Sequence, residues 1–237
     1  MNVTVWNENF HEKENPEVLE IYPGGIHGYI ASILKEDGMN VRTVTMDDEE
    51  FGLSDEILRD TDVLIWWGHN RHHIIPDELA SRVQEYVLSG MGFIALHSAH
   101  HSKPFKRLMG TNANLKWMNE GQKERIWTVL PNHPIAEGIP ETFSLEVEEM
   151  YGEPFGIPNP DDVVFMGWFK SGEVFRSGCT FTRENGRIFY FQPGHETFES
   201  FRNPYVQRII KNAVKWACPI VKNKGIPVVW EKEPYEE

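Results

Sequence analysis

The first hundred residues alternate strand-like and helix-like segments, and this alternation limits the available folds more than any other feature. Strand-like segments cover residues 3–6, 41–46, 62–69 and 92–97, and helix-like patterns at 26–38, 54–60 and 76–90 separate them. Strands that are joined through helices pair in parallel by right-handed crossovers. The last two strand-like segments are almost wholly apolar, as expected when helices cover both faces of a sheet. The pattern predicts a flavodoxin-like, doubly wound α/β fold with a parallel sheet.

The middle of the chain changes to consecutive strand-like segments broken by proline, glycine and asparagine. These segments cover residues 124–131, 142–151, 162–169, 173–183 and 186–194. They predict a mostly antiparallel β extension of the same sheet, with Asn185-Gly186 as a tight hairpin turn. Asn203-Pro204 then begins a final amphipathic helix. We expect a single domain over residues 1–219 and a charged C-terminal tail over 220–237, in which 228–230 pack against the domain.

Charge and cysteine content exclude several classes of function. The formal net charge is −13 and no basic run occurs, which argues against nucleic acid as a partner. No apolar run approaches the roughly 20 residues that span a bilayer, so no membrane partner is expected. The start of the chain does not read as a signal peptide, and its two cysteines are far apart, which favours the cytoplasm. A small molecule is the expected partner, and a homo-oligomer is left open.

Histidines gather where the predicted strands end. His69, His97 and His195 each follow a strand, and His27 stands near the start of the first helix. Because ligands of open α/β sheets bind at the carboxyl ends of the strands, these four side chains are expected in one pocket. Three imidazoles suit a catalytic zinc that keeps one open position, so His69, His97 and His195 are the predicted ligands of a divalent metal. A metal-free group that hydrogen-bonds sugar hydroxyls is the alternative.

Two further segments carry groups suited to catalysis. Ser98 lies between a strand and a probable helix, the context of a nucleophile elbow, but Leu96 and His100 replace the small flanking residues of that motif. Glu149 and its neighbours at 148–153 could serve as general acids or bases if the extension folds over the sheet edge. We interpret the remaining histidines as structural: His11, His72, His73, His100, His101 and His133.

Several long motifs give the sequence a family resemblance. LHSAHHSKPFKRLMGT, HPIAEGI, EEMYGEPFGIP, WFKSGEVFRSG and FYFQPGHETF occur in an order that resembles the ThuA-like, trehalose-utilisation proteins, from the first strand to about Pro219. The resemblance implies the fold of class I glutamine amidotransferases, which carry a cysteine on the elbow after the fourth strand. Here the elbow reads Leu96-His97-Ser98-Ala99 without cysteine, whereas His195-Glu196 resembles the histidine and acid of the triad. We therefore predict that the protein lacks glutaminase activity.

The same resemblance implies a carbohydrate-catabolic enzyme, a hydrolase or lyase acting on a disaccharide or 3-keto-glycoside. The alternatives are a glutaminase-like hydrolase that uses Ser98 and His195, and a non-catalytic sugar-binding or sensor protein. Eight tryptophans are compatible with an aromatic-walled pocket for sugar rings. The expected catalytic residues are His97, His195, Glu196 and Glu149, and the expected substrate-binding residues are His27, Ser98, Tyr151 and Arg176.

Overall fold

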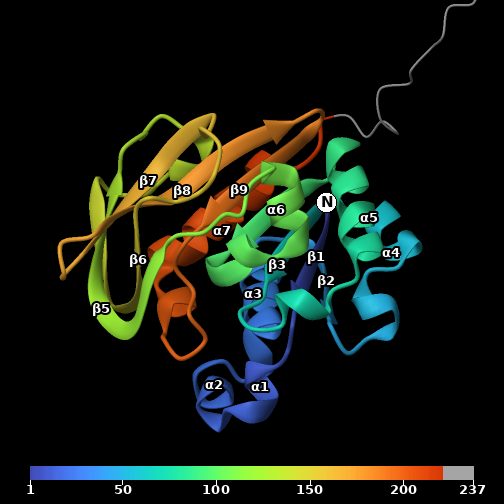
Figure 1. Cartoon of the computed structure of the whole chain (residues 1–237), viewed down its shortest axis with the longest axis horizontal. Helices are drawn as coiled ribbons and strands as arrows, with labels where there is room; N and C mark the ends of the chain where they lie inside the picture. The colour runs from blue at the N-terminus through green and yellow to red at the C-terminus, as the bar shows by residue number, and fades with distance from the viewer. Residues whose placement is uncertain (221–237) are drawn as a thin grey trace, which may run out of the picture.

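Nine strands form one continuous sheet in the computed structural model, which describes residues 1–220 (Figure 1). Their order across the sheet is β2-β1-β3-β4-β9-β8-β7-β5-β6. The strands are β1 (Asn2–Asn7), β2 (Asn40–Thr45), β3 (Val63–Trp67), β4 (Gly92–Leu96), β5 (Lys116–Thr128), β6 (Thr142–Gly152), β7 (Asp162–Phe169), β8 (Val174–Arg183) and β9 (Gly186–Phe191). Of the predicted tail, residues 221–237 with the segment 228–230 lie outside the described residues.

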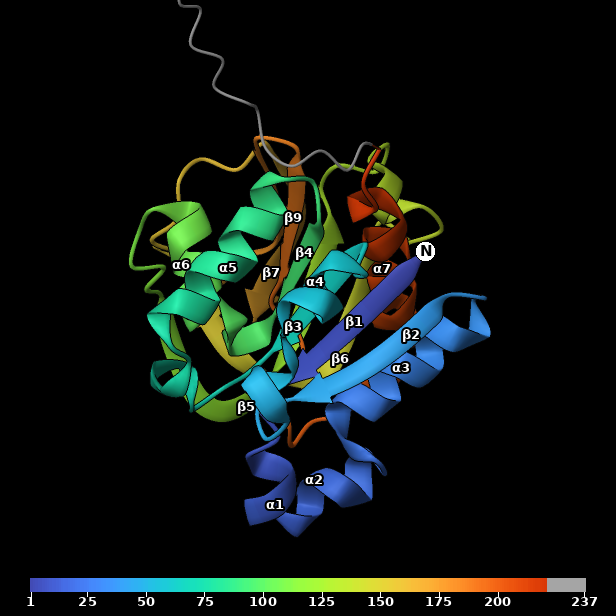
Figure 2. The same ribbon diagram turned by 90° about the vertical axis from the view of Figure 1, so that its right-hand side faces the viewer.

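Helices cover both faces of the parallel half, which consists of β2, β1, β3, β4 and β9. The helices are α1 (His11–Glu14), α2 (Pro16–Ile21), α3 (Gly25–Glu36), α4 (Asp55–Arg59), α5 (Asp77–Leu88), α6 (Lys103–Met109) and α7 (Pro204–Ala217). Figure 2 shows α3 and α7 on one face of this half and α4, α5 and α6 on the other, and the two apolar cores divide in the same way. The predicted doubly wound fold is confirmed.

The antiparallel half consists of β8, β7, β5 and β6, and it joins the parallel half through β9. β9 pairs in parallel with β4 and antiparallel with β8, so it belongs to both patterns. β5 begins at Lys116, whereas the sequence predicted a strand from residue 124. The prediction missed the first half of β5 because that half is polar and exposed and lacks an apolar alternation. Figure 1 shows β5 and β6 curving away from the plane of the parallel strands.

The hairpin between β8 and β9 differs by one residue from the prediction. Arg183 pairs with Gly186, so Glu184 and Asn185 form the turn, and Glu184 takes a positive φ of 49°. Gly186 already lies in the ladder, where an added Cβ would meet the carbonyl oxygen of Val87 at the end of α5. Close packing against that helix requires this glycine, and the turn itself does not.

Within residues 1–220, no helix combines the length and apolar character needed to cross a membrane.

Candidate functional site

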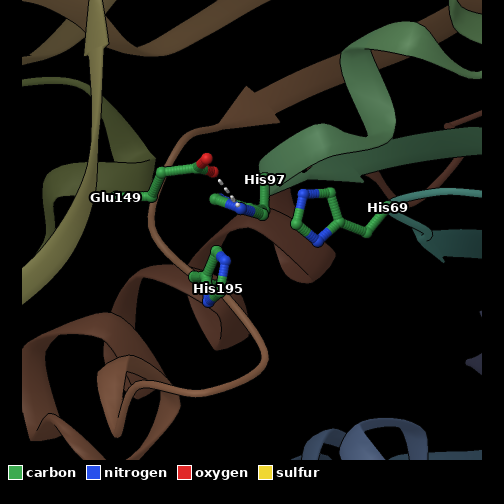
Figure 3. A group of neighbouring side chains, drawn as sticks. All are labelled: His69, His97, Glu149 and His195. Carbon is green, nitrogen blue, oxygen red and sulfur yellow. Dashed lines mark ion pairs between the residues drawn. The ribbon is translucent and has the colours of Figure 1, made fainter. Parts of the chain in front are cut away.

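Three imidazoles and one carboxylate converge at the carboxyl edge of the parallel strands (Figure 3). His69 follows β3, His97 follows β4, His195 follows β9, and Glu149 reaches the group from β6. One ligand atom from each of the four lies within 4.8 Å of the others. The ring centroids of the three histidines are 5.2, 5.4 and 5.5 Å apart. We call these four residues the His/Glu cluster; it contains the three histidines that the strand ends predicted together.

The elbow after β4 presents His97. Its φ of 53° is unusual for a residue with a side chain and places the imidazole at a sharp strand-to-helix turn. The sequence pointed to Ser98 as the elbow residue, and the structure corrects this by one position. The Ser98 hydroxyl is instead hydrogen-bonded to the hydroxyl of Tyr151 at 2.7 Å. Among the hydrogen bonds of residues 1–220, none joins Ser98 to His195.

His97 is fully buried between a carbonyl and a carboxylate. Its Nδ1 donates a hydrogen bond to the carbonyl oxygen of Gln192 at 2.9 Å, and its Nε2 lies 3.0 Å from Oε2 of Glu149. Burial alone would lower the pKa of His97, but the hydrogen bond and charge of Glu149 outweigh it and raise the pKa to about 9. The pKa of Glu149 is lowered: burial would raise it, but His97 opposes burial and prevails. Without a metal, the two groups therefore form a buried ion pair.

Two carboxylates hold His69 in place. Glu196 accepts a hydrogen bond from Nδ1 of His69 at 2.8 Å, which leaves Nε2 as the nitrogen available to the cluster. Burial would raise the pKa of Glu196, but His69 and its neighbours lower it to about 2, so this carboxylate is ionised. Glu8 accepts the backbone N–H groups of Asn70 and Arg71 at 2.8 and 2.9 Å, which fixes the loop that carries His69.

His195 is oriented differently from the other two histidines. The backbone N–H of Thr197 donates to its Nδ1 at 3.2 Å, so the neutral ring carries its proton on Nε2. Burial lowers the pKa of His195 to about 4, which keeps the ring neutral at pH 7. The buried Glu148 anchors the surrounding loop by accepting hydrogen bonds from the backbone of Gly194 at 2.8 Å and the hydroxyl of Ser200 at 2.5 Å.

A pocket of about 500 Å³ opens beside the His/Glu cluster, within the size range of small-molecule sites. Its walls are His11, His69, Asn70, Ser98, His100, His101, Leu115, Trp117, Asn119, Glu149, Tyr151, His195 and Glu196. Thus Ser98, Tyr151, Glu149 and Glu196 lie where a ligand can reach them.

Two predicted substrate-binding residues do not line this pocket. His27 lies at the start of α3 and accepts a hydrogen bond from the side-chain amide of Asn7, at the end of β1, at 2.9 Å. Arg176 forms two hydrogen bonds with the carboxylate of Glu153, at 2.7 and 2.9 Å. Both side chains are engaged by neighbours that the sequence did not reveal, and their role in substrate binding stays a prediction.

Sequence reasoning missed several residues of the site. His11 lies 3.3 Å from Oε1 of Glu196 and lines the pocket, although the sequence suggested only a charged loop. Its position just after β1 was a usable signal, since that strand ends at the same sheet edge. Trp117 had no such signal, because its strand lacks the apolar alternation that marks strands. Gln192 acts through its backbone carbonyl, which no side-chain pattern reveals.

The α/β fold is similar to that of glutamine amidotransferases. The structure of a glutamine amidotransferase from Thermotoga maritima matches with a TM-score of 0.57 at 11% identity, covering 91% of this chain and 96% of that one. A ThuA-like protein from Parabacteroides merdae matches with a TM-score of 0.69 at 16% identity, covering 95% and 99%. A cytoplasmic protein from Salmonella typhimurium gives 0.63 at 12% identity, covering 92% and 100%. At these identities the likeness concerns the fold alone.

The sequence itself identifies the family. Residues 2–217 match the ThuA family, described as trehalose utilisation, and the chain belongs to it. Membership supports a role in carbohydrate utilisation in general. A comparison with curated protein sequences gives no match.

Proposed function

We propose that the protein is a metal-assisted carbohydrate-catabolic enzyme, and that His69, His97 and Glu149 hold a divalent ion. The observation that carries this proposal is that His69 and His97 are each held by a hydrogen bond at Nδ1, on the side of the ring away from the cluster. Each has its Nδ1 bound to an oxygen, of Glu196 or of the Gln192 backbone, so each Nε2 is left for the cluster. Outer partners of this kind orient most metal-binding histidines.

The contact between His97 and Glu149 supports the same ligand set. Their facing atoms are 3.0 Å apart, close to the spacing of neighbouring ligands on an ion bound at about 2.0–2.2 Å. Apart from this contact with His97, Oε2 of Glu149 is buried and has no hydrogen-bond partner within the described residues. Two histidines and a glutamate form one of the ligand sets of catalytic zinc, which keeps a further position for water or substrate. Zinc is therefore the ion we propose.

The sequence predicted His69, His97 and His195 as the three ligands. In the ligand set proposed here, Glu149 takes the place of His195. Because the N–H of Thr197 donates to its Nδ1, the Nε2 of neutral His195 carries a proton and has no lone pair for a metal. We propose that His195 stabilises charge beside the ion. Its neutral state at pH 7 leaves an Nε2–H that can hydrogen-bond an oxygen as it gains negative charge.

The proposed substrate is a disaccharide or 3-keto-glycoside, and the reaction is cleavage of its glycosidic bond by hydrolysis or elimination. A bound zinc ion polarises a carbonyl or lowers the pKa of a bound water to about 7. The departing glycosidic oxygen would take up a proton from the attacking water in hydrolysis, or from the sugar C–H beside the carbonyl in elimination, while the Nε2–H of His195 hydrogen-bonds it as the C–O bond breaks. Ser98 and Tyr151, which line the pocket, hydrogen-bond sugar hydroxyls. Glu196 keeps His69 oriented and stays ionised throughout.

A screen for cleavage of trehalose and its 3-keto derivative tests this function, with zinc-loaded protein, chelated protein and the double variant His97→Ala, His195→Ala. We expect cleavage that zinc supports and chelator abolishes, and no cleavage by the double variant. A sensor protein would instead bind sugar without turnover, and the double variant would keep that affinity. Turnover that survives both chelation and the double substitution contradicts the proposal.

A further inference from the structure

We propose that Trp117 and Asn119 form a sugar-ring subsite at the mouth of the pocket, and that this subsite selects an uncharged ring over a phosphorylated one. The inference rests on the proposed function, because it assigns a second part of the same pocket to the substrate. Neither residue belongs to the His/Glu cluster, and both lie on the exposed first half of β5.

Trp117 differs from the tryptophans that build the core. Its side chain is 58% exposed although it lines the pocket, whereas Trp6, Trp66 and Trp67 are buried. The β5–β6 register pairs Trp117 with Tyr151, and directly paired residues of antiparallel strands place their side chains on the same face. Tyr151 also lines the pocket, next to Ser98. The strand pairing therefore fixes the backbone of Trp117 so that its indole ring borders the space in front of the cluster.

Asn119 adds a polar group beside this ring. Asn119 lies where the β5–β6 register is irregular, between Met118 and Gly121, and both Trp117 and Asn119 line the pocket. A pyranose ring presents an apolar C–H face and a rim of hydroxyls. An exposed indole can cover that face, and an exposed amide can donate to and accept from the rim. Large apolar side chains left exposed in a concave site indicate a ligand surface.

The charge of the pocket decides between a neutral sugar and a phosphate ester. Its lining holds the carboxylates of Glu149 and Glu196 and no lysine or arginine, so far as residues 1–220 are concerned. Proteins recognise phosphate through arginine, lysine or backbone N–H groups at helix N-termini. A phosphoryl group in this pocket would therefore meet the carboxylates of Glu149 and Glu196 and no lysine or arginine side chain.

Sugar binding to zinc-loaded and to chelated protein, measured by titration calorimetry with trehalose and trehalose 6-phosphate as probes, tests the subsite. We expect trehalose to bind at least tenfold more tightly than trehalose 6-phosphate. Trp117→Ala should weaken trehalose binding at least fivefold, Trp117→Phe should restore most of it, and Asn119→Ala should weaken it less. Trp168→Ala, on the exposed face of β7, is the matched control and should bind as the wild type does.

Three results would overturn the subsite: no trehalose binding by the wild type, wild-type affinity in Trp117→Ala, or equal affinity for the phosphorylated probe. Melting temperatures of the variants confirm that each is folded. Trp117-dependent binding in protein that takes up no zinc and cleaves nothing would support the subsite and remove the metal-assisted reaction, so the two proposals fail separately.

Discussion

The two halves of the sheet are built differently, and the site needs both. In the parallel half, every residue of β3 and β4 is buried, because helices cover both faces. In the antiparallel half, β5 and β7 leave one face open, and Trp168 is 48% exposed there. The parallel half supplies the histidines and the antiparallel half supplies Glu149. The well-packed parallel half thus positions the imidazoles, and the more exposed antiparallel half brings the carboxylate of Glu149 to them.

The order of the strands in the sheet does not by itself bring Glu149 close to the histidines. β6 is the edge strand, four places from β9 in the sheet. The sheet curls, and side chains close the gap: Gln192 donates to the backbone carbonyl of Glu149 at 3.0 Å, and Glu148 accepts from Gly194 at 2.8 Å. Loss of either half should therefore abolish the site, although only one half carries the imidazoles.

The largest expected effect is a loss of catalytic activity. Removing a proposed ligand from either half of the sheet should lower kcat/KM by the same factor. His97→Ala removes a proposed ligand from the parallel half, and Glu149→Gln removes one from the antiparallel half. Each should lower kcat/KM by about 10³-fold, roughly 4 kcal/mol of transition-state stabilisation. The control is His73→Ala, which changes an exposed histidine in the loop after β3. If Glu149→Gln keeps wild-type kcat/KM, the antiparallel half does not contribute to the reaction.

The next effect concerns stability. Ile65→Ala in β3 empties a fully buried position between two helical layers and should lower the free energy of unfolding by about 2–5 kcal/mol. Val174→Ala in β8, where the side chain is 48% exposed, should change it by less than about 0.5 kcal/mol. Urea denaturation measures both. Similar losses would show that the two halves do not differ in packing as described.

The ion pair between the halves predicts a pH dependence in chelated protein. Folding raises the pKa of His97 from 6.5 to about 9, so its stabilisation is complete below pH 6.5 and is lost as pH rises through about 9. This loss amounts to at most about 3 kcal/mol. Glu149→Gln removes the partner and should flatten the profile. Denaturation at pH 6.5 and 9.5 tests this; a wild-type stability that rises over that interval would contradict the sign.

The smallest expected effect is on the stability of the antiparallel half, where Glu124 is buried. Burial and the nearby Glu148 raise its pKa well above 4.5, so folding favours the protonated form, and stability falls as pH rises from 4.5 through the raised pKa. Glu124→Gln removes this proton uptake and should stabilise the protein at pH 7 by roughly 1 kcal/mol. The control is Glu120→Gln at an exposed position of the same strand. A destabilised Glu124→Gln variant would show that the carboxyl group itself is needed.

The parallel half could be predicted from sequence because its signals are local. Strands such as 62–69 are continuous apolar runs between helices, and a histidine at the end of each run shares an edge with the others. His69, His97 and His195 lie together as expected. His27 is bound to Asn7, the last residue of β1, and does not line the pocket.

The contribution of the antiparallel half depended on contacts that sequence does not encode locally. Glu149 was a candidate, but only the curl of the sheet brings it to His97. The polar start of β5 hid Trp117, and the elbow conformation that presents His97 is a backbone property. The ligand set and the catalytic roles stay predictions.

The two halves of the sheet are proposed to share one metal site. This can be tested with an anomalous difference map at the zinc edge, measured on crystals of tag-free protein grown with zinc. We expect one strong peak about 2.0–2.2 Å from Nε2 of His69, Nε2 of His97 and the carboxylate of Glu149. No peak at this site, or a peak bound only by residues of the parallel half, would contradict it.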